Sequence, residues 1–161
     1  MQIFDGKAHA KILEEQIRSF LEINPKFTNA SSASENPKLG IVKIGDNPAS
    51  KTYVNLKKKF CDSIGISVEV LSLNDTFSDD EIFEFVKEFF SRQDILGGIV
   101  QLPLPRPSLE PVLGLIPASK DVDLLSPESK RKFYGGDFSK LPPTVRAFDY
   151  FLNQTELDQE H

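Results

Sequence analysis

The stretch from Leu39 to Gly65, LGIVKIGDNPASKTYVNLKKKFCDSIG, carries the pattern that decides the fold. It opens with an apolar, β-branched run that stops at a glycine, which predicts a buried strand over residues 39–44. Turn residues occupy 46–48, and helical periodicity then predicts a helix that starts at residue 49 or 50 and ends near residue 65. A buried strand that leads directly into a helix is typical of α/β proteins.

The same alternation of strands and helices continues on both sides of this stretch. Ser78-Asp79-Asp80-Glu81 forms a capping box, which predicts the start of a helix. Residues 24–37 are small, polar and flanked by proline, and we expect a flexible surface loop there. The remaining predicted elements are a helix over about 6–21, strands over 68–73 and 97–102, short helices near 109–116 and 127–133, and a helix over 145–152.

This order predicts an α/β domain with three layers, α/β/α, in which helices cover both faces of a mostly parallel sheet. Ligands of such sheets bind beyond the carboxyl ends of the strands. Eight of the eleven prolines lie between Pro103 and Pro143, so that segment is expected to be irregular. Irregular segments that follow a strand end often build binding sites.

Composition narrows the classes of function. A chain of 161 residues forms one domain, or one and a fraction, and its net charge of −5 disfavours a nucleic-acid partner. Cys61 is the only cysteine, and His9 and His161 are the only histidines, which leaves no disulfide and no Cys/His zinc site. No apolar run approaches the roughly 18 residues that span a bilayer. We therefore expect a protein of a reducing compartment without a membrane partner or a metal.

Several standard motifs are absent. The sequence has no G-x-G-x-x-G dinucleotide fingerprint. Gly40 and Gly45 have the spacing of a P-loop, but Asp46 and Asn47 follow where Lys and Ser or Thr are required. Cys61 is interpreted as a small packing residue of the predicted helix rather than a nucleophile.

Tyr53 and Lys57 lie four residues apart on the predicted helix. At about 100° per residue, Lys57 falls about 40° from Tyr53, inside a stripe of large apolar residues, whereas Lys58 and Lys59 point to solvent. One interpretation is that Lys57 extends its ammonium group from the edge of this stripe into water. The other is a partly desolvated lysine, which exchanges protons more readily near neutral pH. The Tyr-x-x-x-Lys spacing also occurs in short-chain dehydrogenases, but their glycine-rich loop and longer chain are missing.

A second polar group follows the third predicted strand. Gln101 stands where the apolar run ends and could simply cap free backbone groups. Asp121 and Asp123 lie in the proline-rich segment and could form an exposed Asx turn. Combined with Tyr53 and Lys57, these residues instead suggest a cleft that contains a base, an amide and a carboxylate.

Four motifs, in order along the chain, resemble the catalytic domain of the bifunctional methylenetetrahydrofolate dehydrogenase/methenyltetrahydrofolate cyclohydrolase family. They are Asp5-Gly6-Lys7, residues 42–50 with Tyr53-Val54, Lys57 and Gly65-Ile66, residues 97–105 (GGIVQLPLP), and Pro117 with Lys120-Asp121-Val122-Asp123.

The resemblance implies an enzyme of folate one-carbon metabolism. It interconverts 5,10-methylene-, 5,10-methenyl- and 10-formyl-tetrahydrofolate, by NAD(P)-dependent hydride transfer and by hydrolysis of the methenyl bridge. In that case Lys57 handles protons, Gln101 hydrogen-bonds and tunes it, Tyr53 stacks on the pterin, and Asp123 binds the pterin amino group and ring nitrogen. The resemblance also implies Ser50, Val100, Leu102 and Pro103 as further substrate-binding residues and Thr144 as a cofactor-binding residue.

The family resemblance carries further expectations. The cofactor is NADP or NAD, the substrate is a folate, the protein is a cytoplasmic homodimer, and its pathway serves purine biosynthesis. Residues 1–145 are expected to form the catalytic domain. Residues 146–161 are expected to start the linker helix toward an NAD(P)-binding Rossmann domain outside this sequence. A homologue that binds folate or a partner subunit without turnover, and a domain with cyclohydrolase activity alone, remain alternatives.

Two departures from the family pattern stand out. Leu124 follows Asp123 where the family has glycine, and leucine disfavours positive φ, so the turn that holds Asp123 is expected to differ. Pro143 and Val145 replace the cysteine and the second proline of the family's Pro-Cys-Thr-Pro, while Thr144 matches.

Overall fold

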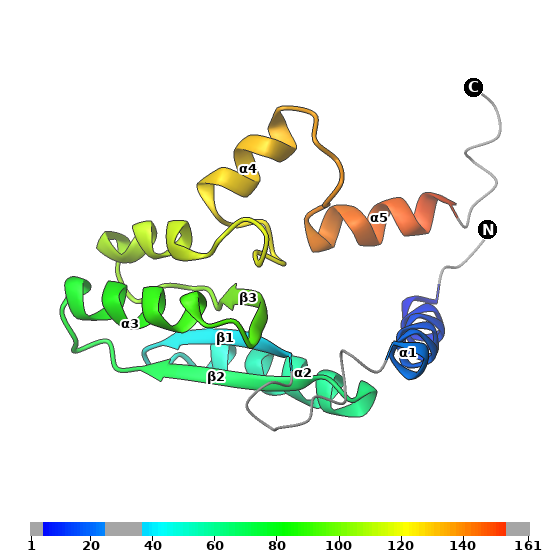
Figure 1. The fold of residues 1–161 in the computed structure, drawn as a ribbon, viewed down its shortest axis with the longest axis horizontal. Helices are drawn as coiled ribbons and strands as arrows, with labels where there is room; N and C mark the ends of the chain where they lie inside the picture. The colour runs from blue at the N-terminus through cyan, green and yellow to red at the C-terminus, as the bar shows by residue number, and fades with distance from the viewer. Residues whose placement is uncertain (1–4, 25–36, 154–161) are drawn as a thin grey trace.

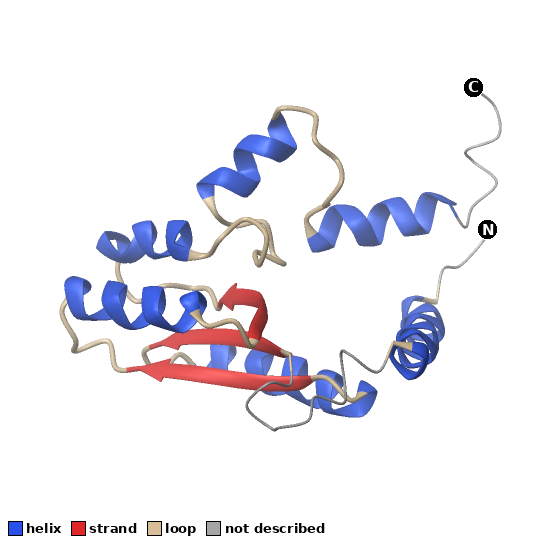
Figure 2. Ribbon diagram, viewed as in Figure 1, coloured by secondary structure: helices blue, strands red, loops and turns tan. Residues whose placement is uncertain are grey.

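The computed structural model describes residues 5–24 and 37–153, and within them three parallel strands form the central sheet. The strands are β1 (Lys38–Ile44), β2 (Ser67–Leu73) and β3 (Ile95–Val100), in the order β2-β1-β3 (Figure 2). Ile41 of β1 is level with Val70 of β2 and Ile99 of β3. The carboxyl ends of all three strands therefore reach the same edge of the sheet. The third strand ends at Val100, two residues before the predicted end, because Leu102 belongs to the loop that follows.

Helices cover both faces of this sheet (Figure 1). On one face α2 (Pro48–Ile64) packs through Val54 against Ile41 and Ile99. On the other face α3 (Asp79–Ser91) and the 3₁₀ helix η2 (Pro107–Leu115) form the larger core cluster. The predicted α/β fold, with a parallel sheet between helical layers, is confirmed.

Helix α2 has clear start and stop signals. The Asn47 side chain accepts a hydrogen bond from the Ser50 N–H, and Pro48 occupies the first turn, where its missing N–H costs nothing. Gly65 ends the helix at φ 82°, a conformation that favours glycine. These caps set where α2 begins and ends.

The predicted inward stripe of α2 is wrong in part. The buried residues of the helix are Ser50, Val54, Cys61 and Ile64, while the large side chains Tyr53, Leu56 and Phe60 are exposed. Small residues let the helix approach the sheet closely, and the bulky ones are excluded from that contact. Lys57 does lie on the inward side, and Cys61 has the predicted packing role. Burial raises the pKa of its thiol, which disfavours the reactive thiolate.

Three further helices lie beyond the sheet layers: α1 (Gly6–Ile23), α4 (Pro127–Tyr134) and α5 (Pro143–Asn153). The His9 ring of α1 meets Tyr150 of α5 edge to face, with ring centroids 5.7 Å apart. The predicted boundary between residues 145 and 146 falls within α5 and stays a prediction. Most of the loop predicted at 24–37 lies outside the described residues.

None of the described helices is both long enough and apolar enough to cross a membrane. Across residues 5–24 and 37–153, no three His, Cys, Asp or Glu side chains are grouped as a metal site would require.

Candidate functional site

Lys57 lies between an amide and a carboxylate that come from different parts of the chain. Its Nζ donates a hydrogen bond to Gln101 Oε1 at 3.2 Å and lies 3.6 Å from Asp123 Oδ2. The side chains of Lys57 and Asp123 are 31% and 25% exposed, so both are shielded yet accessible to a ligand. The structure thus brings together three of the residues that the sequence singled out.

Gln101 is held in place by both its backbone and its side chain. Its N–H donates to Val42 O at 2.8 Å, which continues the pairing with β1 beyond the end of β3. Its side-chain Nε2 donates to Leu102 O at 2.8 Å, so Oε1 is the atom left to face Lys57. This arrangement orients the amide oxygen toward the ammonium group.

The start of α2 is tied to the same loop. Ser50 is buried, and its Oγ donates to Leu102 O at 3.2 Å. Leu102 and Pro103, joined by a cis peptide bond, have exposed side chains, whereas Val100 is buried at the end of β3. Of the predicted substrate-binding residues, Leu102 and Pro103 are therefore accessible to a ligand, whereas Val100 and Ser50 are buried.

Tyr53 and Thr144 lie apart from the three-residue contact. Tyr53 is one turn before Lys57 on α2, and the residue is 58% exposed. A ring with a free face next to the lysine suits stacking on a planar ligand. Thr144 is exposed in the first turn of α5, an element separate from those that carry Lys57, Gln101 and Asp123.

The turn after Asp123 keeps a left-handed residue, contrary to the sequence expectation. Leu124 has φ 53°, the region that usually favours glycine, and its side chain is only 7% exposed. Burial of the leucine side chain offsets the backbone cost of about 1–2 kcal/mol. The backbone geometry that a glycine would give is therefore reached here with leucine.

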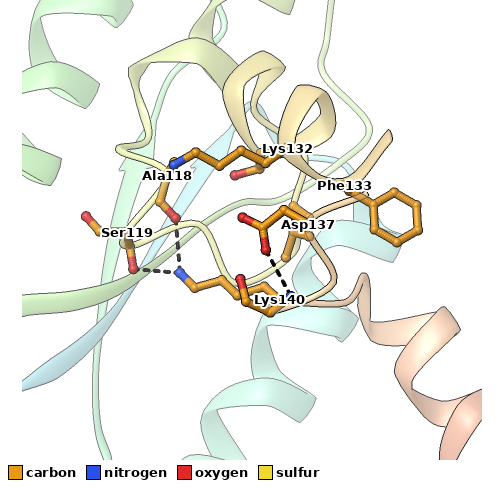
Figure 3. Close-up of a pocket in the computed structure, with 9 residues that line it drawn as sticks. Ala118, Ser119, Lys132, Phe133, Asp137 and Lys140 are labelled. Carbon is orange, nitrogen blue, oxygen red and sulfur yellow. Dashed lines mark hydrogen bonds between the residues drawn. The ribbon is translucent and has the colours of Figure 1, made fainter. Parts of the chain in front are cut away.

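A cavity of about 200 Å³ lies behind this turn (Figure 3). Lys140 donates hydrogen bonds to Ala118 O at 3.0 Å and Ser119 O at 2.9 Å, which joins the segment before α5 to the segment before the turn. Leu124 also lines the cavity, whereas Lys57, Gln101 and Asp123 do not. Hydrogen bonds from Ser139 lower the pKa of Asp137 at its rim.

Arg106 was missed from the sequence, and the complete burial of Asp121 was not predicted. Arg106 donates to Asp79 Oδ1 at 2.7 Å, to Asp75 O at 2.6 Å and to Phe77 O at 2.8 Å, which links the loop after β3 to the loop before α3. The partners of Arg106 lie 27 to 31 residues earlier in the chain, and the proline-rich context gives no local signal of them. Asp121, for which the sequence left open an exposed Asx turn and a place in the cleft, is completely buried. Asp121 instead accepts from the nearby N–H groups of Leu125 and Ser126.

A parallel α/β sheet with a lysine, an amide and a carboxylate near its strand ends is the arrangement in which domains of the open α/β class bind small molecules. Residues 4–123 match the family model described as "Tetrahydrofolate dehydrogenase/cyclohydrolase, catalytic domain". The chain belongs to this family.

Curated relatives and solved structures agree with this assignment. The chain is 33% identical over 143 residues to the bifunctional protein FolD of Helicobacter pylori strain J99, covering 88% of the chain and 48% of that protein. It is 36% identical over 142 residues to the FolD protein of a Wolbachia strain from Drosophila simulans, covering 88% and 47%. The chain thus spans about half the length of the curated relatives it matches.

The fold is shared with structures of the same family. The bifunctional FolD methylenetetrahydrofolate dehydrogenase/cyclohydrolase of Campylobacter jejuni aligns with a TM-score of 0.75 at 28% identity, covering 92% of this chain and 52% of that one. The Trypanosoma brucei enzyme, complexed with NADP cofactor and inhibitor, aligns with a TM-score of 0.80 at 22% identity, covering 94% and 51%.

The start of α2 does not have the features of a dinucleotide site. The junction between β1 and α2, where a pyrophosphate would bind in a Rossmann unit, carries the carboxylate of Asp46. The Ser50 N–H at the start of α2 already donates a hydrogen bond to the Asn47 side chain. Asp46 is itself paired with Lys51 at 2.7 Å and Lys43 at 3.7 Å, so this helix start offers a phosphate neither the Ser50 N–H nor an unpaired lysine. No step of the chemistry below therefore runs through NAD(P).

Proposed function

We propose that this domain binds a tetrahydrofolate derivative and hydrolyses the 5,10-methenyl bridge to give 10-formyltetrahydrofolate. The observation that carries the proposal is the placement of Lys57 Nζ between Gln101 Oε1 and Asp123 Oδ2. Family membership supplies the substrate class, and the geometry supplies a proton-transfer group.

The hydrolysis requires proton movements that one amine can perform. Water attacks the methenyl carbon of the cationic substrate, a C–O bond forms, and one proton is lost to Lys57 or to solvent. The bond from this carbon to N5 then breaks as N5 gains a proton and the hydroxyl oxygen loses one, which leaves the formyl group on N10. The net reaction releases one proton. The hydrogen bond from Lys57 to Gln101 orients the amine while these protons are transferred.

Substrate orientation falls to the accessible groups around the lysine. Asp123 would accept hydrogen bonds from the pterin amino group and ring nitrogen, and Tyr53 would stack against the ring system. Ser50 holds the Leu102 carbonyl, so it supports the loop instead of touching the reacting atoms. The same orientation would present the methylene bridge for hydride transfer, the step for which the family uses NADP or NAD.

The first experiment follows the loss of methenyltetrahydrofolate absorbance with the wild-type chain and with Lys57→Met. The matched control is Lys58→Met, because Lys58 is the next residue, carries the same charge and pairs with Asp62 on the exposed side of α2. We expect hydrolysis to vanish with Lys57→Met and to persist with Lys58→Met. Equal rates for wild type and Lys57→Met would refute the catalytic proposal.

A second candidate function is folate binding without turnover. The chain spans about half the length of its relatives, which favours testing binding and catalysis separately. Calorimetric titration with methenyltetrahydrofolate, with Asp123→Ala as the control, measures binding directly. Heat from the wild type without hydrolysis would support the binding function, and no heat would eliminate it.

Family membership also supports a cytoplasmic homodimer whose product serves purine biosynthesis. Exposed apolar side chains such as Ile12 of α1 and Phe148 of α5 offer surface for self-association. Sedimentation analysis at several protein concentrations tests the dimer, and a single monomeric species at all of them would exclude it. Fractionation of the source cells tests the location, and rescue of a purine requirement tests the pathway.

A further inference from the structure

Asp121 is a fully buried carboxylate to which the proposed reaction gives no task. Its Oδ2 accepts a hydrogen bond from the Ser126 N–H at 2.9 Å, and its Oδ1 accepts one from the Leu125 N–H at 3.3 Å. Both donors are backbone groups that lie just after the left-handed Leu124. The side chain therefore closes the turn that contains Asp123.

The first half of this turn is anchored to the sheet. The Gly98 N–H donates to Lys120 O at 2.6 Å, and the Val122 N–H donates to Gly98 O at 3.4 Å, so residues 120–122 run beside β3. Lys120 Nζ donates to Phe90 O at 2.8 Å and to Arg92 O at 2.7 Å. Asp121 thus ties the free half of the turn, residues 124–126, to residues 120–122, which are hydrogen-bonded to β3 and to the end of α3.

Packing alone does not fix the free half. Leu124 is one of the residues that line the cavity, so empty space borders the turn. A turn next to a cavity has room to shift without a steric clash. The hydrogen bonds to Asp121 therefore act together with the burial of Leu124 and Ser126 in setting its position.

We propose that Asp121 is a positioning residue, which holds the turn so that the Asp123 carboxylate stays beside Lys57. The proposal rests on the proposed function, because the value of this position is the binding of a folate next to the lysine. Asp121 itself touches neither Lys57 nor the expected ligand position, and it acts through the backbone of Leu125 and Ser126.

The test compares Asp121→Asn with a variant that destabilises the fold elsewhere. Asparagine keeps the size of the side chain but turns one acceptor into a donor that faces a backbone N–H. Val86→Ala truncates a buried residue of α3, remote from the turn in sequence and part of the main core. For both variants, NMR of the Lys57 side-chain nitrogen and the Asp123 carboxyl carbon is recorded, together with calorimetric titration of methenyltetrahydrofolate.

We expect Asp121→Asn to shift both NMR signals and to weaken folate binding about tenfold, the effect of losing one charged hydrogen bond. Val86→Ala should shift neither signal and leave binding within about twofold, although its unfolding midpoint falls. Unchanged signals and affinity in folded Asp121→Asn would overturn the proposal. If the wild-type chain binds no folate, the proposed function fails, and the NMR signals still decide the role of Asp121.

A second pair of variants tests the same contact from the donor side if Asp121→Asn does not fold. Ser126 has φ −66°, which proline accepts, so Ser126→Pro removes the N–H that Asp121 binds along with the hydroxyl. Ser126→Ala removes only the hydroxyl that caps α4. A larger shift at Asp123 with proline than with alanine supports the proposal, and equal shifts contradict it.

Discussion

The ammonium group of Lys57 lies 3.6 Å from Asp123 Oδ2 and donates a 3.2 Å hydrogen bond to Gln101 Oε1, so one cation contacts both a charged and a neutral acceptor. The neutral acceptor matters for the proposed chemistry. An amide orients the amine without adding a second negative charge, and a lysine flanked by two carboxylates would hold its proton more firmly.

Gln101→Glu should therefore slow hydrolysis of methenyltetrahydrofolate at neutral pH. A carboxylate at this position stabilises the charged lysine, and a higher pH is then needed to obtain the neutral amine. We expect the rising limb of the pH–rate profile to move to higher pH. Gln93→Glu adds the same charge at an exposed site between α3 and β3 and should leave the profile in place. A profile that is identical for Gln101→Glu and wild type would contradict a proton-transfer role for Lys57.

Leu124 allows a test of its left-handed backbone. Replacing it with alanine removes the buried side chain but keeps the Cβ atom at φ 53°, whereas glycine removes both. Both variants should lose about 2–4 kcal/mol of unfolding free energy through the lost burial. Leu124→Gly should be the more stable of the two by about 1 kcal/mol, because only glycine is free of the left-handed cost.

The control for this comparison is Leu113, which is buried to the same extent, 7% exposed, within η2. There the usual order applies, and Leu113→Gly should be less stable than Leu113→Ala by about 0.5–1 kcal/mol. Urea denaturation of the four variants measures both differences. The same order at both positions would show that Leu124 is not under backbone strain.

Local signals in the sequence predicted most of the secondary structure. The capping box forms as expected, since the Ser78 N–H donates to Glu81 Oε2 at 2.8 Å and the Glu81 N–H donates to Ser78 Oγ at 3.3 Å. Helical phase placed Lys57 on the inward side of α2, because position on a helix depends only on spacing. Gln101 and Asp123 stood out as polar residues after the third predicted strand, and the family motifs then gave each a role beside the lysine.

Features that depend on distant contacts could not be predicted in the same way. Gly98 is required because a Cβ atom there would lie 2.5 Å from the ring of Phe90, a residue of the preceding helix. The large apolar side chains of α2 were predicted to face the sheet. The helix lies too close to the sheet for them, and the smaller Ser50, Val54 and Cys61 are buried there instead. The partners of Arg106 likewise follow only from the folded chain.

Arg106→Lys should loosen the loop before α3. Lysine keeps the charge, but its single nitrogen cannot reach Asp79, Asp75 O and Phe77 O together as the guanidinium does. We expect the Phe77 N–H to exchange with solvent about fivefold faster, the effect of about 1 kcal/mol of lost local stability. Arg131→Lys, in exposed helix α4, is the control, and equal exchange in both variants would exclude a linking role for Arg106.

The opposite end of the sheet carries an acid-sensitive ion-pair network. Glu69 of β2 and Asp94 each contact both Arg92 and Lys38, and hydrogen bonds from Arg92 lower the pKa of Glu69 to about 2. The same arginine lowers the pKa of Asp94. A carboxylate whose pKa is lower in the folded chain stabilises the fold above its unfolded value. That contribution is lost as the pH falls through the folded value.

Glu69→Gln should therefore lower the unfolding temperature at pH 7 and flatten its dependence on pH. For wild type, the contribution of Glu69 disappears between about pH 4.5 and about pH 2, because protonation breaks the contacts with Arg92 and Lys38. Glutamine at position 69 carries no charge that protonation could remove. The unfolding temperatures of wild type and Glu69→Gln should therefore converge toward pH 2. Glu84→Gln, which alters an exposed pair with Lys87, should follow wild type throughout. A constant difference between wild type and Glu69→Gln across this range would show that the network adds no pH-dependent stability.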